Sequence, residues 1–346
     1  MSEVPQGIDS TGVTSWFETN VGDLAGPLSF ELIAGGHSNL TFFVHDTAAA
    51  NSWVLRRPPL GNVLATAHDM GREHRIMGAL AHCEVPVPAM IGYCEDLSVN
   101  DAPFYVMEVV EGHVIRNITD AGLITVAARS TASKSLAHVL ASLHNVDVDA
   151  VGLANLAKHD GYIERQLRRW LRQFHAAKTS ELPAIDKVHE LLSSSMPDQQ
   201  GVGIVHGDYR LDNCIVDDDG HVKAVLDWEL CTLGDVMADI GLLMVYWAEP
   251  DDDVLALEGI ATVAEGFATR DQVIDWYGAA SGRDVSNIEY YIAFANWRLA
   301  CILEGVYARY LAGAMGDKVP DELSSYRPRI ESLVNEALRL AKGLHV

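Results

Sequence analysis

Hydrophobic positions in the first third of the chain fall into short runs typical of β-strands. From about Leu28 to Glu108 the runs LSFELI, LTFFVHD, SWVLRR and FYVMEVV are bounded by Gly, Pro, Asn and Asp. One stretch differs, because the apolar residues of His68–Ala81 recur near helical spacing and two prolines follow it. The pattern predicts a small sheet interrupted by one helix.

Beyond Gly112 the apolar spacing changes to that of long helices. The predicted helices are 119–145, 161–177, 286–311 and 321–342. One β-like island, 203–229, lies among them, and in it the runs CIV and KAVLDW flank the turn DDDGH. The sequence EGH at 111–113 is the predicted boundary, so we expect an α+β protein with one domain at 1–110, including an N-terminal extension 1–25, and a mainly helical one at 111–346.

Composition narrows the class of protein. The 346 residues are 49% hydrophobic, a composition typical of globular proteins. The net charge of -23 disfavours a nucleic-acid partner, because its phosphates would be repelled. Five scattered cysteines without a CxxC pair favour neither a zinc knuckle nor a disulfide framework, so we expect a cytoplasmic protein. The longest apolar run, 236–248, contains Asp239 and is too short to span a bilayer, so no membrane insertion is expected.

Acidic and amide side chains gather in the β-like island. Asp208 and Asn213 follow an apolar strand, and Asp227 follows one hairpin later. Phosphoryl transfer requires an aligned hydroxyl nucleophile and metal ions that bridge the phosphates. Asp208 can accept the hydroxyl proton, while Asn213 and Asp227 offer the oxygen ligands that Mg²⁺ prefers. The spacing therefore predicts a magnesium-dependent phosphotransferase site.

The same island resembles a known family. His206–Asn213 matches the catalytic loop HGDxxxxN of the aminoglycoside phosphotransferase and choline kinase-like family, and VLDWE and GDVMADIG resemble its metal-binding segment and the helix start after it. The form is closest to the kinase-like domains linked to acyl-CoA dehydrogenases. Over about Leu28–Ala314 the resemblance implies a protein-kinase-like two-lobe fold with an antiparallel sheet in the small N-terminal lobe, ATP and Mg²⁺ as cofactors, and a small-molecule hydroxyl acceptor.

The resemblance also assigns a nucleotide site to the N-terminal lobe. VLRRPP resembles the strand that contacts the nucleotide phosphates, with Arg56 where most kinases carry lysine, and Glu73 would hold Arg56 in place. Main-chain groups from Glu108 to Val110 would meet the adenine. A turn between two strands would cover the phosphates, or would be a plain hairpin turn, and its candidate residues are Gly35, Gly36, Ser38 and Asn39.

Other polar residues near the loop are expected to have supporting or alternative roles. The resemblance implies that His206 orients the loop rather than acts as the base, and that Asp239 braces the loop from behind. Asp235 is expected to cap the helix after Gly234. Arg210 could face the terminal phosphate or pair with nearby acidic residues. The aromatic stripe that carries Arg298 and Glu304 could line an acceptor pocket, although such stripes are more often core.

Three classes of function remain open at this stage. The favoured one is phosphorylation of a hydroxyacyl-type metabolite, and an aminoglycoside acceptor is the alternative within the same class. A nucleotide-binding pseudokinase is kept open by Arg56. A protein kinase is disfavoured because the HGD and DWE sequences differ from HRD and DFG. The sequence does not predict the oligomeric state.

Overall fold

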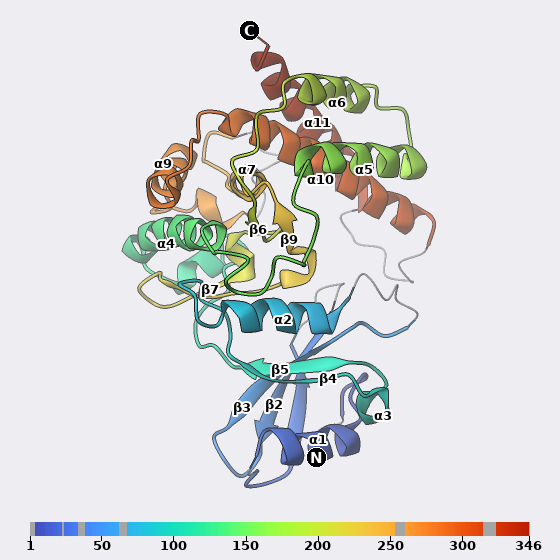
Figure 1. Cartoon of the computed structure of the whole chain (residues 1–346), viewed down its shortest axis with the longest axis vertical. Helices are drawn as coiled ribbons and strands as arrows, with labels where there is room; N and C mark the ends of the chain where they lie inside the picture. Colours follow the sequence, from blue (N-terminus) through green and yellow to red (C-terminus); the bar gives the residue numbers. More distant parts are fainter. Residues whose placement is uncertain are drawn as a thin grey trace. The chain divides into compact units, whose positions relative to one another are not determined.

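The structure, a computed structural model, describes residues 4–22, 24–33, 39–61, 68–252, 260–313 and 323–345. The chain divides into two compact units (Figure 1). The first contains Met1–Gly112 and Lys223–Glu229, and the second contains His113–Val222 and Leu230–Val346.

The first unit is built on a five-stranded antiparallel sheet with the strand order β1-β2-β3-β5-β4. The strands are β1 (Leu28–Leu32), β2 (Leu40–Asp46), β3 (Ser52–Arg57), β4 (Met90–Cys94) and β5 (Phe104–Glu108). Four of them are the predicted runs. β4 was not predicted, and its pairing with β5 shifts register between Met90 and Gly92, which weakens the alternating pattern.

Helices cover both faces of this sheet (Figure 1). They are α1 (Ser10–Asn20), α2 (Met70–Leu80) and the short α3 (Leu97–Asn100). Side chains alternate along β5, so Phe104 and Val106 pack in one core cluster with Val13 and Phe17 of α1, whereas Tyr105 meets α2 on the opposite face. α2 begins where its N-cap Asp69 accepts a hydrogen bond from the Arg72 backbone N–H.

The second unit is mainly helical. Its α-helices are α4 (Val126–His144), α5 (Tyr162–Ala177), α6 (Ala184–Ser194), α7 (Met237–Tyr246), α9 (Arg270–Ser281), α10 (Ile288–Leu311) and α11 (Tyr326–Gly343). α10 packs against α5, α6, α7 and α11, which explains why half of its residues are buried. The predicted α+β class is confirmed. No helix among the described residues is long and apolar enough to cross a membrane.

Short strands position the acidic island. β6 (Gly203–Val205) pairs antiparallel with β9 (Thr232–Gly234), and β7 (Cys214–Val216) leads into a turn at Asp217–His221. β8 (Val222–Val225) starts at the end of that turn and continues into Lys223–Glu229. The loop that follows β6 carries Asp208, and the helix that follows β9 is α7.

Candidate active site

The loop after β6 is held from behind by Asp239 of α7. The Asp239 carboxylate accepts hydrogen bonds from the backbone N–H groups of His206 at 2.6 Å and Gly207 at 2.9 Å, and lies 3.3 Å from Nε2 of His144. Burial alone would raise the pKa of Asp239, but the hydrogen bonds from His144 and the loop amide lower it below its usual value. Asp239 is therefore an ionised brace, the position expected from the sequence.

Asn213 fixes the Asp208 carboxylate. Its side-chain nitrogen Nδ2 donates to the Asp208 carbonyl oxygen at 2.8 Å and to the carboxylate Oδ2 at 2.9 Å. This orientation turns the amide oxygen of Asn213 away from Asp208 and leaves it available as a metal ligand. His206 is fully buried, and its Nδ1 accepts from the Asp208 backbone N–H at 3.3 Å. His206 thus supports the loop from inside.

Arg210 lies among carboxylates in this structure. Its Nε is 3.3 Å from Oδ2 of Asp208 and 3.1 Å from Oδ1 of Asp212. Burial raises the pKa of Asp212, and the Arg210 charge partly opposes that rise. The guanidinium also lies 4.9 Å from the centre of the Tyr246 ring. Of the two roles considered for Arg210, pairing with acidic residues is the one its contacts show.

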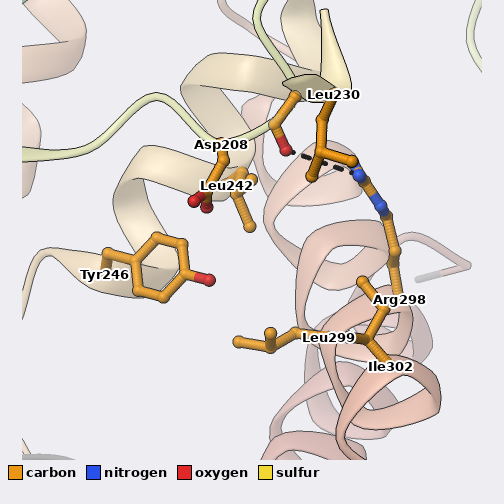
Figure 2. A pocket seen from close by; sticks show the side chains of 8 residues that line it. Asp208, Leu230, Leu242, Tyr246, Arg298, Leu299 and Ile302 are labelled. Carbon is orange, nitrogen blue, oxygen red and sulfur yellow. Dashed lines mark hydrogen bonds between the residues drawn. The ribbon is translucent and has the colours of Figure 1, made fainter. Parts of the chain in front are cut away.

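A pocket opens beside Asp208 within the second unit (Figure 2). Its volume is about 190 Å³. Two helices supply most of the wall, since Leu242 and Tyr246 are one turn apart on α7, and Arg298 and Ile302 are one turn apart on α10. The complete lining is Gly207, Asp208, Leu230, Leu242, Tyr246, Arg298, Leu299 and Ile302.

Sequence reasoning found only part of this pocket. The stripe on α10 was considered as an acceptor wall, but Leu242 and Tyr246 were not, because an apolar run such as 236–248 looks the same whether it faces a core or a cavity. α10 serves both purposes: Tyr290, Trp297 and other residues are core, while Leu299 and Ile302 face the pocket.

In the first unit, Arg56 lies between two carboxylates. Arg56 and Tyr105 are direct partners in the β3–β5 pairing, so both side chains point to the α2 face of the sheet. There Arg56 Nε lies 3.3 Å from Glu73, and Nη2 lies 2.5 Å from Asp227. The Tyr105 hydroxyl donates to Glu73 at 2.9 Å. The structure thus brings together three residues assigned from the sequence, Arg56, Glu73 and Asp227.

Burial dominates the electrostatics of this cluster. It raises the pKa of Glu73 to about 7, although the Arg56 charge and the Tyr105 hydrogen bond act in the opposite direction. Burial alone would lower the pKa of Arg56, but Tyr105 and the two carboxylates raise it above its usual value. Arg56 therefore stays charged, and Glu73 is the titrating member near neutral pH.

The other residues assigned to the nucleotide are less closely gathered. Asn39 is buried, and its Nδ2 donates to Glu73 at 3.1 Å, so its side chain supports the Arg56 cluster. The Glu108 carboxylate accepts from the Ala89 backbone N–H at 3.0 Å. Val110 follows the end of β5 and is half-buried. Gly35, Gly36 and Ser38 lie outside the described residues.

Asp227 has a left-handed backbone with φ of 63°, an unusual conformation for a residue with a side chain. Asp227 belongs to the first unit and carries an anionic oxygen, whereas Asn213 belongs to the second unit and carries a neutral one. Among the described residues there is no group of three or more His, Cys, Asp and Glu able to hold a metal. Mg²⁺ keeps several water and phosphate ligands and therefore needs few protein ligands. Two protein oxygens suit it better than a metal whose ligands are all protein side chains.

Known proteins share this sequence pattern. The profile of the phosphotransferase enzyme family matches residues 29–281. Acyl-CoA dehydrogenase family member 10 of Mus musculus is 38% identical over 300 residues, covering 83% of this chain and 27% of that protein. Acyl-CoA dehydrogenase family member 11 of Homo sapiens is 32% identical over 311 residues, covering 89% and 39%. The chain thus spans well under half the length of these relatives.

Solved structures share the fold. A protein from Ralstonia eutropha JMP134, provisionally assigned as an aminoglycoside phosphotransferase, superposes with a TM-score of 0.82 at 32% identity, covering 97% of this chain and 98% of that chain. Aminoglycoside phosphotransferase APH(4)-Ia, as a thermostable variant in complex with AMP-PNP and hygromycin B, gives a TM-score of 0.60 at 13% identity, covering 94% and 98%. The predicted protein-kinase-like fold and the resemblance read from the catalytic loop are both confirmed.

Proposed function

This chain belongs to the phosphotransferase enzyme family and is a small-molecule kinase, and we propose that it transfers the terminal phosphate of ATP to a hydroxyl group of a hydroxyacyl-type metabolite. One observation carries the proposal: the Asp208 carboxylate, fixed by Asn213 on a loop braced by Asp239, opens into a pocket of about 190 Å³. A carboxylate in that setting is suited to take a proton from a bound alcohol.

The proposed reaction is a single displacement. The acceptor hydroxyl oxygen forms a bond to the γ-phosphorus of ATP while the bond between that phosphorus and the bridging oxygen of ADP breaks. Asp208 receives the hydroxyl proton, and the products are a phosphate ester and ADP. Asn213 holds Asp208 in one orientation, so little reorganisation is required when the hydroxyl arrives.

Arg56, Asn213 and Asp227 are the residues proposed for the phosphates and the metal. Arg56, kept charged between Glu73 and Asp227, is proposed to neutralise the phosphates nearer the adenosine. Asn213 and Asp227 are proposed as the protein ligands of Mg²⁺, which would neutralise charge on the phosphates when bound. The pseudokinase alternative is disfavoured because Asp208, Asn213 and Asp227 are all present.

The pocket and the relatives support this choice of acceptor class. The pocket wall beside Asp208 is largely leucine, isoleucine and tyrosine, which suits a carbon-chain metabolite. Both relatives described above are named as acyl-CoA dehydrogenase family members, so an acyl compound is a natural acceptor to test. An aminoglycoside is the alternative, and it would require carboxylates in the pocket beyond Asp208.

The test is acceptor-dependent release of ADP by the purified protein with Mg-ATP. The panel contains hydroxyacyl compounds, sugars, choline-like alcohols and aminoglycosides, with mass spectrometry to identify the phosphate ester. We expect turnover with hydroxyacyl compounds and none with aminoglycosides. Turnover confined to an aminoglycoside would overturn the acceptor assignment, and measurable Mg-ATP binding without turnover on any acceptor would favour the pseudokinase.

A further inference from the structure

Arg298 is a buried cation in the wall of the pocket. It lies on α10 with 7% of its surface exposed. In the part of the chain that the structure describes, no carboxylate lies within ion-pair distance of it, in contrast to Arg56 and Arg210. Removing a charged group from water costs free energy unless a partner replaces the water. A buried arginine without an acidic partner therefore requires another compensating contact.

The contacts that Arg298 makes satisfy only part of its guanidinium. Nη2 donates to the Gly207 carbonyl oxygen over a long 3.4 Å (dashed line in Figure 2). The guanidinium carbon lies 5.7 Å from the centre of the Trp170 ring. The centre of the same Trp170 ring also lies 5.2 Å from the guanidinium carbon of Arg169. Nε makes no hydrogen bond to any described residue. Hydrogen-bonding capacity is therefore left over on a positive group beside the pocket.

The rest of the pocket does not supply a counter-charge. Its remaining side chains are apolar or phenolic except Asp208, which Arg210 and Asn213 already contact. Burial raises the pKa of Tyr246 to about 12, the Asp208 and Asp212 carboxylates add to that rise, and the charges of Arg210 and Arg298 act against it. A polycation entering here would meet a buried like charge.

The volume of the pocket also favours a small acceptor. The volume of about 190 Å³ is smaller than the roughly 300–1,000 Å³ of clefts that hold drug-sized ligands. A volume of this size accommodates a short carbon chain with one polar group.

We propose that Arg298 binds an acyl oxygen of the acceptor, a carboxylate or a carbonyl, and thereby selects small hydroxy acids and their acyl derivatives over neutral alcohols and polycations. The inference rests on the proposed function for the reaction itself, but it concerns recognition. Arginine suits this role because its planar fork can bond an oxygen through one edge while Nη2 keeps its contact with Gly207. The apolar side chains on α7 and α10 would contact the carbon chain between the acyl oxygen and the hydroxyl.

A purely structural role for Arg298 predicts something different. If the guanidinium only supports Gly207 and packs on Trp170, replacing it would disturb the catalytic loop and weaken every acceptor equally. A recognition role instead weakens only acceptors that carry the acyl oxygen. Matched pairs of acceptors therefore distinguish the two roles.

The experiment measures binding by isothermal titration calorimetry to the full chain with Mg-AMP-PNP present. The probes are 3-hydroxybutyrate, 4-hydroxypentanoate and 5-hydroxyhexanoate, their methyl esters, and the diols of the same chain length. We expect the acid or ester that binds best to lose about 10- to 100-fold in affinity in Arg298→Met, the range for a lost charge-assisted hydrogen bond. The matching diol should change less than about threefold, and Arg298→Lys should restore part of the loss for the acid. Arg168→Met, on the exposed face of α5, is the control and should change neither.

The outcomes separate the inference from the proposed function. Wild-type protein that binds neither acids nor esters more tightly than diols overturns the inference, as does an equal loss for acid, ester and diol in Arg298→Met. Selective binding that depends on Arg298, but with no phosphate transfer to any of these probes, supports the inference and counts against the proposed reaction. A difference between acids and esters shows whether carboxylate or carbonyl is the preferred group.

Discussion

The hydrogen bonds that Asp239 makes to the catalytic loop allow a quantitative prediction. Asp239→Asn keeps the shape of the side chain but removes its charge and replaces one oxygen by an NH₂ group. The native carboxylate accepts from two loop amides, at 2.6 and 2.9 Å, and faces His144, with only 1% of the residue exposed. The two loop amides donate to different oxygens of Asp239, so an NH₂ group in place of either oxygen leaves one buried amide facing a donor instead of an acceptor.

The destabilisation expected in Asp239→Asn follows from the number and type of hydrogen bonds that are lost. Each hydrogen bond to a buried charge contributes about 1.5–3 kcal/mol, so loss of one bond and weakening of another should destabilise the loop by about 3–5 kcal/mol. A displacement of the loop by about 1 Å would also misplace Asp208, which can lower kcat by about 100-fold. Because the chain has two units, global unfolding is not a clean two-state measurement.

Amide hydrogen exchange provides the local assay. The backbone amides of His206 and Gly207 should exchange at least about 100-fold faster in Asp239→Asn, because they are the groups that lose the acceptor. Asp275→Asn, an exposed residue of α9, is the matched control and should change nothing. Unchanged protection of both amides in Asp239→Asn would refute the reasoning.

Two further predictions follow from strained or titrating positions. Because the pKa of Glu73 is raised from 4.5 to about 7, the folded chain retains a proton that the unfolded chain loses, so stability should fall as pH rises through that window. Glu73→Gln should remove this part of the slope between pH 5 and 8, measured as the stability of the first unit from hydrogen exchange of its α2 and β5 amides after correction for intrinsic exchange rates. Exposed Glu31→Gln should not, and an unchanged slope in Glu73→Gln would contradict the assignment. Gly207 has φ of +88°, and an added Cβ would lie 2.9 Å from the Leu230 carbonyl oxygen, so Gly207→Ala should lower kcat by about 100-fold. Gly122→Ala, where a Cβ meets nothing within 4 Å, is its control, and equal rates for the two variants would show that the loop tolerates the side chain.

Local signals predicted much of the first unit but not all of it. The runs that became β1, β2, β3 and β5 are short, largely apolar and bounded by turn residues. α1 was missed because only Val13 and Phe17 along it are buried, although Asp9 at its N-cap was a readable start signal. β4 was missed because Gly92 and the register shift interrupt its pattern.

The site was predictable where spacing along the chain determines proximity. Asp208 and Asn213 are five residues apart on one loop, so their contact follows from the motif. Arg56 and Asp227 are 171 residues apart, and the sequence assigned them separate roles without predicting that they touch. The pocket depends on how α7 and α10 pack, which no periodicity in either helix specifies.

The central claim is that Asp208 is the base of a phosphotransferase. The most direct test compares Asp208→Asn with the wild type for acceptor-dependent ADP release and, separately, for Mg-ATP affinity. The account predicts that kcat falls by about 10²–10⁴-fold while the Kd for Mg-ATP changes less than about threefold, because only proton transfer and orientation of the hydroxyl are lost. A variant that turns over within about tenfold of the wild-type rate would contradict it.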